Sequence, residues 1–459
     1  MRRIVSGCLL CLLGVPVGCA GSPPVARDPA IGWWRGWATF RGARLELGVH
    51  FFRERDGVKA TLSCPDMMIL DQPLDDVHQA GRQIRFATRD ERPLRFGGEL
   101  AGDSIRAVAP VGAVPSVVES RPGSESSMQL ELRRAPAPPA PPYSTRNVRF
   151  TAGTARLAGT LLVPASAHGR NAGVVILQGS SFNLRREYLF QADHFARAGF
   201  VVLSFDKRGA GESSGDYDAA SYDDLAGDAA AAVECLRSQP EVDSLRVGLW
   251  GLSQGAFIAP RVAARVPSLR FIVAVSAPGM PVGESAIFQD SVRLASAGFG
   301  VTEVRRALSL NRRLLAWLRG SQAGDELAAL LARASDTPWR RASSLPARLP
   351  AGAALEGWYW RGRTSDPAPW WSAVRAPVLG VYGAADELVP AGRSAELIER
   401  ALRVGGNRDV TMRVFASANH ELRTLPLVAG GPWDWPRAAP GYLDFVTTWM
   451  LAHSHRATR

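Results

Sequence analysis

Apolar and polar residues alternate through the first part of the chain, from about residue 28 to residue 134. An alternation with period two places every second side chain on the same face of a strand. The apolar faces of three such runs consist of Leu45, Leu47, Val49 and Phe51; of Val58, Ala60 and Leu62; and of Met128, Leu130 and Leu132. Glycine and Asp-Gly turn signals separate the runs. The pattern predicts several short antiparallel strands in a small all-β sandwich or barrel.

A proline-rich segment at residues 135–142 follows, and five of its eight residues are proline. Such a run favours polyproline II and acts as a semi-rigid linker. From residue 143 to residue 459, strand patterns alternate with amphipathic helical patterns. This alternation predicts an α/β domain with a mainly parallel, doubly wound sheet that helices cover on both faces.

Between about residues 281 and 369 the pattern is helical, which predicts a cap insertion over the active-site edge of the sheet. One helix face carries Val304, Ala307, Leu308, Leu315 and Leu318. Thr302 is placed to cap the start of this helix and Gly320 its end. Five aromatic residues near the end of the insertion either line a pocket for an apolar substrate or pack the cap onto the core: Trp358, Tyr359, Trp360, Trp370 and Trp371.

The start of the chain has the features of an export signal. Met1-Arg2-Arg3 is positively charged, and the apolar residues 4–20 fall short of the roughly 20 that a membrane span needs. The junction Gly18-Cys19 resembles a bacterial lipobox, although Pro16 stands where leucine is usual. We therefore expect a lipoprotein-type signal peptide at residues 1–19 with lipidation at Cys19, or else plain secretion or a retained anchor. The expected location is the cell envelope, as a periplasmic or outer-membrane lipoprotein, or the exterior.

Length and composition narrow the function classes. At 459 residues the chain is long enough for about two domains. The net charge is +11, but the only lysines are Lys59 and Lys207 and the arginines are scattered, so we expect no nucleic-acid partner. Cys8 and Cys11 would leave with the signal, and no second cysteine pair or histidine completes a metal site. We expect neither a metal nor another cofactor.

The most informative motif is Gly-Leu-Ser-Gln-Gly at residues 251–255. It follows the apolar strand pattern of residues 246–250 and precedes the helical pattern of residues 256–264. A G-x-S-x-G turn between a strand and a helix holds its serine in a strained, exposed corner at the top of a sheet. Ser253 is therefore the candidate nucleophile.

The partners of this serine follow in the order acid, then histidine. Asp386 comes just after the strand pattern of residues 378–383, with Glu387 as a competing acid one residue on. His420 follows the strand pattern of residues 410–415, and no other of the seven histidines closes a strand after the acid. His420 would take the proton of the serine, and Asp386 would fix the tautomer of the imidazole.

An acyl-transfer site also needs donors for the oxyanion. The backbone N–H of Gln254, next to the nucleophile, is one candidate. The backbone N–H of Ser180, in the loop after the apolar run at residues 174–177, is the other. A plain Gly-Ser turn at residues 179–180 is the alternative interpretation of that loop.

Taken together, these motifs resemble those of the α/β-hydrolase superfamily from about Tyr143 to the C-terminus. Residues 206–213 resemble its D-x-R-G-x-G-x-S turn, which shapes a loop in that family. The sequence W-G-L-S-Q-G-A at residues 250–256 is similar to a bacterial branch of serine esterases, described as prolyl-oligopeptidase-like or acyl-thioesterase-like, some with an extra N-terminal β domain. The chain departs from that branch at Gln178, where histidine is usual, and at Ala256, where a second glycine is common.

The resemblance implies a serine hydrolase that cleaves small-molecule carboxylic esters or thioesters through an acyl-enzyme. A peptidase of prolyl-oligopeptidase-like type is the first alternative. Large members of that group gate peptides with a propeller several times longer than the β domain here, which favours an esterase. The second alternative is a non-catalytic binding protein of the cell envelope, against which the intact Ser–Asp–His order argues. A membrane would be a partner only through a lipid on Cys19.

Overall fold

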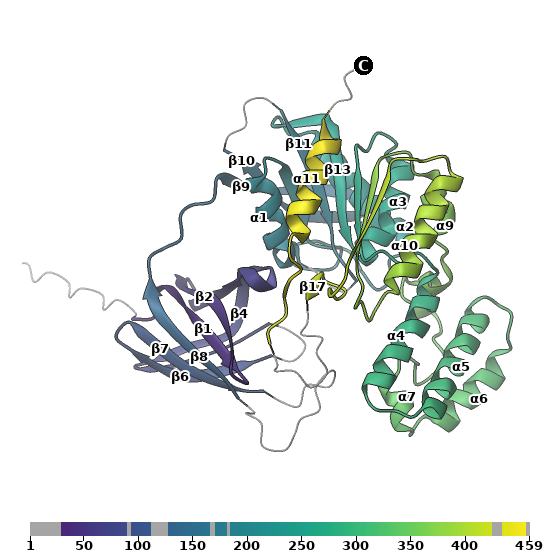
Figure 1. Ribbon diagram of the computed structural model, residues 1–459, viewed down its shortest axis with the longest axis horizontal. Coiled ribbons are helices and arrows are strands. Elements are labelled where there is room, and N and C mark those ends of the chain that lie inside the picture. The colour runs from purple at the N-terminus through teal and green to yellow at the C-terminus, as the bar shows by residue number, and fades with distance from the viewer. Residues whose placement is uncertain are drawn as a thin grey trace, which may run out of the picture.

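The computed structural model describes residues 29–89, 93–111, 127–165, 170–180, 184–424 and 434–455. It consists of an N-terminal β-barrel, an α/β domain and a helical insertion in the α/β domain (Figure 1). In Figure 1 the barrel and the insertion lie toward the same end of the α/β domain and on opposite sides of it. The expected signal peptide and Cys19 lie outside the described residues. Within the described ranges, every helix is too short or too polar to cross a bilayer.

The N-terminal domain is a closed antiparallel barrel in which each strand pairs with the next. The strands are β1 (Gly32–Phe40), β2 (Ala43–Glu54), β3 (Gly57–Cys64), β4 (Ile69–Ala80), β5 (Gln83–Ala87), β6 (Arg95–Ala101), β7 (Ser104–Pro110) and β8 (Ser127–Ala135). The ring closes where β1 pairs with β8 and Trp33 lies opposite Ala135. Of the two architectures open from the sequence, the barrel is the one that forms, and it is not a multi-bladed propeller.

Side chains fill the barrel. The alternating apolar residues of the predicted runs point inward, and the ring of Phe86 contacts those of Phe51 and Phe96. At one end Trp34 is buried, and the guanidinium of Arg134 lies 4.4 Å from the centroid of its ring. The domain is therefore a packed core and not an open cup.

The α/β domain is built on an eight-stranded sheet in the order β16-β15-β14-β13-β11-β12-β10-β9. The strands are β9 (Tyr143–Ala152), β10 (Ala155–Pro164), β11 (Asn171–Leu177), β12 (Val201–Phe205), β13 (Val242–Leu252), β14 (Ile272–Val275), β15 (Val378–Gly383) and β16 (Val410–Phe415). The strands pair parallel from β16 to β12, whereas β10 pairs antiparallel with both of its neighbours, β12 and the edge strand β9. The carboxyl ends of the parallel strands therefore share one edge of the sheet.

Helices cover both faces of this sheet (Figure 1). On one face α2 (Tyr222–Arg237), α3 (Gln254–Arg265), α9 (Ala368–Ala373) and α10 (Ala391–Val404) bury their apolar sides. The 3₁₀ turn η2 (Arg185–Tyr188), α1 (Leu189–Arg197) and α11 (Tyr442–Ser454) do so on the other. The central strands are almost entirely apolar because both of their faces are buried. The predicted fold class, an α/β-hydrolase-type sheet preceded by an all-β domain, is confirmed.

The insertion between β14 and β15 has an apolar core of its own. Its helices are α4 (Val282–Ser296), α5 (Val301–Leu318), α6 (Gly324–Ala334), α7 (Pro338–Ala342) and α8 (Ala353–Glu356), followed by the turn η3 (Arg361–Thr364). Gly320 ends α5 with a φ of 73°, as its sequence position predicts. The predicted cap Thr302 is wrong, because α5 begins at Val301 and the Glu303 carboxylate accepts from the backbone N–H of Gly300 at 3.0 Å.

The barrel and the α/β domain each bury one side chain that comes from the other. Trp435, which precedes the short β18 (Arg437–Ala438), is buried in the barrel core and donates from Nε1 to the Ala43 carbonyl at 3.1 Å. In return Met68, just after the barrel turn η1 (Pro65–Met67), packs in the α/β core beside Tyr188 and Trp250. Because β18 pairs with β17 (Arg423–Thr424), this contact reaches the segment that follows His420.

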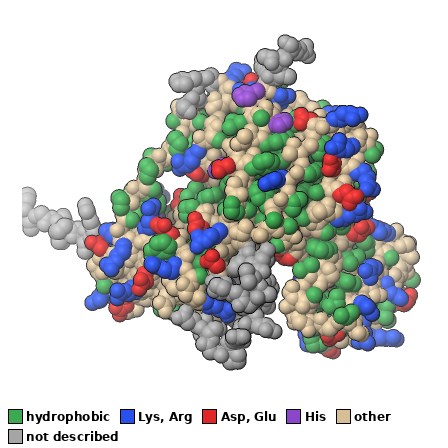
Figure 2. Space-filling model, in the orientation of Figure 1, with side chains coloured by type: hydrophobic (Ala, Val, Ile, Leu, Met, Phe, Trp, Pro, Cys, Tyr) green, Lys and Arg blue, Asp and Glu red, His purple; other side chains and the backbone are tan. Residues whose placement is uncertain are grey.

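Lys and Arg side chains are spread over the barrel, the α/β domain and the insertion (Figure 2). Asp and Glu side chains lie between them on the same face. Ion pairs in the molecule include Arg89 with Asp75 and Arg149 with Glu212. The excess of positive charge is thus distributed over the visible surface.

Candidate active site

Ser253 occupies the sharp turn between β13 and α3. Its φ is 53° and its ψ is −111°, in a region that residues with a side chain rarely adopt. Such a conformation costs about 1–3 kcal/mol and persists only where the surrounding structure enforces it. Hydrogen bonds fix the turn on both sides: the Ser253 N–H donates to Val275 at 2.8 Å, and Phe257 N–H donates to the Ser253 carbonyl at 2.9 Å.

Close packing explains the two glycines of the motif. A Cβ on Gly255 would lie 2.1 Å from the carbonyl oxygen of Leu177, at the end of β11. A Cβ on Gly251 would lie 2.7 Å from the backbone nitrogen of Ala256. Any side chain at either position would push α3 away from the sheet and open the turn that holds Ser253.

Asp386 and His420 are brought together from neighbouring strands. Asp386 follows β15, His420 follows β16, and both are buried. The distance from His420 Nδ1 to Asp386 Oδ2 is 2.8 Å. An ionised carboxylate can only accept, so Nδ1 carries the proton in this pair and Nε2 keeps its lone pair. That tautomer is the one a general base needs.

The carboxylate itself is held on its other oxygen. Asp386 Oδ1 accepts from the backbone N–H groups of Leu388 and Val389, each at 2.8 Å. The histidine loop is held as well, because Ser276 Oγ donates to the His420 carbonyl at 2.8 Å. Ser276 has a φ of 49° and directly follows β14, which lies between β13 and β15 in the sheet. Sequence reasoning missed Ser276, although a serine directly after a fully apolar strand was a visible signal.

Glu387, the competing acid, makes no hydrogen bond to His420 in the described part of the chain. Burial is the main cause that raises the pKa of its carboxyl, and the neighbouring Asp386 adds to the increase. The geometry therefore favours Asp386 as the partner of the imidazole.

Ser253 lies on the same edge of the sheet as this pair, at the end of β13. Among the described residues Ser253 Oγ and His420 Nε2 form no hydrogen bond, so the structure pairs Asp386 with His420 but not His420 with Ser253. Catalytic hydrogen bonds of this kind are often long without substrate and tighten in the complex.

One candidate oxyanion donor follows Ser253 in the chain, and the other follows Gly179, which lies close to Ser253. Gln254 is the first residue of α3, so its N–H has no acceptor inside the helix. Ser180 follows Gly179, where a Cβ would lie 3.8 Å from the Cβ of Ser253. The Gly179 N–H donates to the hydroxyl of the buried Tyr188 at 2.8 Å. Tyr188 is a second residue that sequence reasoning missed, and no short motif marks it.

The D-x-R-G-x-G-x-S turn folds on itself beside this loop. Asp206 accepts from the backbone N–H groups of Arg185 at 2.8 Å and Glu212 at 3.1 Å, and its carbonyl accepts from Ser213 Oγ at 2.7 Å. At the position where the esterase branch has histidine, the amide of Gln178 donates to the carbonyl of Phe205.

The aromatic residues at the end of the insertion mostly pack. Trp371 is buried in the α/β core. The guanidinium of Arg261 lies 4.8 Å from the Trp370 ring, and that of Arg363 lies 4.8 Å from the Trp360 ring. Of the two interpretations left open by the sequence, the contacts of these residues fit the packing of cap onto core.

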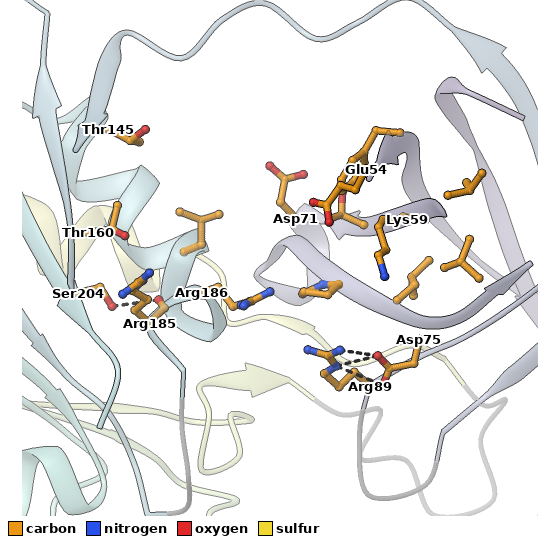
Figure 3. Close-up of a pocket in the computed structure, with 18 of the residues that line it drawn as sticks. Glu54, Lys59, Asp71, Asp75, Arg89, Thr145, Thr160, Arg185, Arg186 and Ser204 are labelled. Atoms are coloured by element: carbon orange, nitrogen blue, oxygen red, sulfur yellow. Dashed lines mark hydrogen bonds and ion pairs between the residues drawn. The ribbon is translucent and has the colours of Figure 1, made fainter. Parts of the chain in front are cut away.

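A cavity of about 810 Å³ lies between the barrel and the α/β domain (Figure 3). Its walls include Lys59 and Asp71 from the barrel and Thr160 and Ser204 from the sheet. None of the candidate catalytic residues lines it. Within the described ranges, no group of three or more histidine, cysteine or acidic side chains is placed to hold a metal ion.

A parallel sheet with a serine at a strand–helix elbow and an acid–histidine pair at the same edge defines a hydrolase of the α/β-hydrolase fold. The comparisons agree with this class. Residues 153–414 match the family described as X-Pro dipeptidyl-peptidase (S15 family), and the chain belongs to that family. The matched region contains Ser253 and Asp386 and ends before His420.

Individual relatives are more distant. A thiohydrolase of Arthrinium phaeospermum is 31% identical over 120 residues, which are 25% of this chain. The chain spans only 38% of the length of that curated relative. An esterase of Pyrococcus furiosus is 19% identical, with 68% of this chain and 89% of that chain covered and a TM-score of 0.42. A thermophilic esterase of Thermogutta terrifontis is 16% identical, with 68% and 100% covered and a TM-score of 0.40.

The pairing of acid and base gives a prediction for the variant Asp386→Asn. Asparagine can still accept from Leu388 and Val389, but its NH₂ group then faces Nδ1 of His420 and imposes the wrong tautomer. We expect the kcat for an activated ester to fall by about 10⁴-fold, as in other triads of this kind. Glu387→Gln is the matched control and should have a much smaller effect. A larger loss in Glu387→Gln would show that Glu387 is the acid.

Proposed function

We propose that this protein is a serine hydrolase that cleaves carboxylic esters or thioesters of small molecules through an acyl-enzyme intermediate. The observation that carries the proposal is the hydrogen-bonded pair of Asp386 and His420 at the edge of the sheet where the strained Ser253 lies. Backbone strain of this kind is maintained at functional sites, which also argues against a non-catalytic binding protein.

In the acylation step Ser253 Oγ attacks the carbonyl carbon of the ester, and His420 Nε2 takes the proton of the hydroxyl. The carbonyl oxygen becomes an oxyanion, which the N–H groups of Ser180 and Gln254 stabilise. The tetrahedral intermediate collapses when His420 returns the proton to the leaving alcohol or thiol. Asp386 stabilises the imidazolium between these two events without taking its proton.

In the second half of the reaction water replaces the alcohol. His420 removes a proton from the water as it attacks the acyl-enzyme, and the same two N–H groups stabilise the second oxyanion. Collapse of this intermediate releases the carboxylic acid and restores the hydroxyl of Ser253.

Two observations bear on the choice between esters and peptides. The N-terminal domain is a filled barrel and not the propeller that gates peptides in large prolyl-oligopeptidase-like enzymes. The similarity to a thiohydrolase supports thioesters as a second substrate class. The description of the family as an X-Pro dipeptidyl-peptidase makes a peptidase the competing candidate.

A substrate panel tests the proposal. We expect p-nitrophenyl esters or acyl-CoA thioesters to be cleaved with a higher kcat/KM than Xaa-Pro nitroanilides. Ser253→Ala should lower the kcat of the best substrate by several orders of magnitude, since the loss of a triad nucleophile in other enzymes costs about 10⁶-fold. The control is Ser238→Ala, because Ser238 lies at the end of α2, at the opposite edge of the sheet. A preference for Xaa-Pro nitroanilides would favour the peptidase.

We also propose that the protein is exported and held at a membrane by a lipid on Cys19. The support is the charged start, the apolar run and the Gly18-Cys19 junction in the sequence. Metabolic labelling with a fatty acid should label the wild-type protein, and Cys19→Ser should abolish the label and release the protein or leave it unprocessed. Cys64→Ser is the control, because Cys64 is buried in the barrel. An unlabelled wild-type protein would exclude the anchor.

A further inference from the structure

One buried charge in the α/β domain has no part in the mechanism described so far. Lys207 follows β12 in the D-x-R-G-x-G-x-S turn, and only 6% of its surface is exposed. It is one of two lysines in a chain with 54 basic residues. A buried ammonium is costly unless it is paired or hydrogen-bonded, so its contacts should explain its position.

The ammonium of Lys207 lies behind the loop that carries Ser180 and the turn that carries Ser253. Its Nζ donates to the carbonyl of Gly179 and, at 2.7 Å, to the side-chain Oε1 of Gln254. It also lies 4.7 Å from the ring centroid of Tyr217, whose hydroxyl donates to the same Gln254 oxygen at 3.0 Å.

The contact with Gly179 determines the direction of the Ser180 N–H. The carbonyl of Gly179 and the N–H of Ser180 belong to one planar trans peptide group, in which they point in opposite directions. When the ammonium holds the carbonyl from behind, the N–H points away from Lys207. Below pH about 7, where the Lys207 amine is protonated, its positive charge also polarises the peptide and makes the Ser180 N–H a stronger donor.

The contact with Gln254 acts on the second donor. Gln254 is the residue whose backbone N–H begins α3, and its buried side chain is held by Lys207 and Tyr217. A single nitrogen atom therefore bridges the peptide group that contains the Ser180 N–H and the side chain of Gln254. A lysine suits this role better than an arginine, because its charge is a compact point with rotatable donors and not a planar fork.

We propose that Lys207 is a positioning residue of the acyl-transfer site, which fixes the oxyanion donors of Ser180 and Gln254 through Gly179 and the Gln254 side chain. This inference rests on the proposed function, since it assigns a role in the reaction proposed above. It predicts that the loss of Lys207 weakens the transition state more than the binding of substrate.

The test compares Lys207→Met with Lys59→Met. Methionine keeps the length and apolar stem of the lysine side chain, and Lys59 is the other lysine, partly exposed and paired with Asp56. We expect Lys207→Met to lower the kcat for a p-nitrophenyl ester by about 10²-fold or more, in the range for a lost oxyanion donor, with KM changed less than about threefold. Lys59→Met should behave like the wild type.

A second measurement distinguishes the positioning of the oxyanion donors from a general structural defect in the variant. Benzeneboronic acid forms a tetrahedral adduct with a catalytic serine and mimics the oxyanion, so its inhibition constant should rise in Lys207→Met in parallel with the loss of kcat. Lys207→Gln, which keeps an uncharged donor, should lie between Lys207→Met and the wild type in both measurements. A Lys207→Met with the kcat and boronate affinity of the wild type would overturn the inference, as would a loss that appears only in KM.

The burial of Lys207 in the folded protein can be checked by measuring how the free energy of unfolding depends on pH. Burial lowers the pKa of Lys207 from 10.5 to about 7, against the opposing charge of Glu187. Between these pH values the unfolded chain binds more protons than the folded protein, so the stability of the wild type rises with pH relative to that of Lys207→Met.

A wild type that cleaves no ester at all would refute the proposed function, whereas an active wild type with an equally active Lys207→Met refutes only the role of Lys207.

Discussion

The close approach of α3 to the end of β11 is the constraint on which the site depends. Because Gly255 packs against the carbonyl of Leu177 with no room for a side chain, the first turn of α3 lies directly beside the loop that begins at Gly179. This packing forces Ser253 into its strained turn between strand and helix. Ser253 and the backbone N–H groups of Ser180 and Gln254, the proposed oxyanion donors, are therefore positioned by backbone packing, and the apolar sheet beneath supplies the rigidity that holds the strain.

A second close approach builds the other half of the site. A Cβ on Gly383 would lie 2.2 Å from the carbonyl of Ala418, so the loop after β15 and the loop after β16 can meet only at a glycine. The Ala385 N–H donates to the same carbonyl at 2.9 Å, which joins the loop of Asp386 to that of His420. The segment beyond His420 continues into the contact with the barrel, so the N-terminal domain supports this half of the site from outside.

The parts of this arrangement that could be predicted from the sequence are local. The glycines at positions 251 and 255 and the strands before Asp386 and His420 are visible as short patterns, because each depends on residues next to it in the chain. The closure of β1 on β8 could not be predicted, since a sandwich and a barrel share the same alternation. Neither the burial of Trp435 beside Ala43 nor the reach of Lys207 to Gly179 leaves a local pattern, because both join segments that are far apart in the chain.

In the proposed reaction Ser253 carries the acyl group. Trypsin releases this serine in the peptide of residues 247–261, which contains no other hydroxyl, thiol, lysine or histidine side chain. The most direct measurement is to mix the enzyme with p-nitrophenyl acetate, quench with acid in the first turnovers and map the acetyl group by mass spectrometry. We expect one acetyl group per chain, on that peptide. Turnover of the ester with no acetyl group on that peptide, or with an acetyl group on another residue, would contradict it.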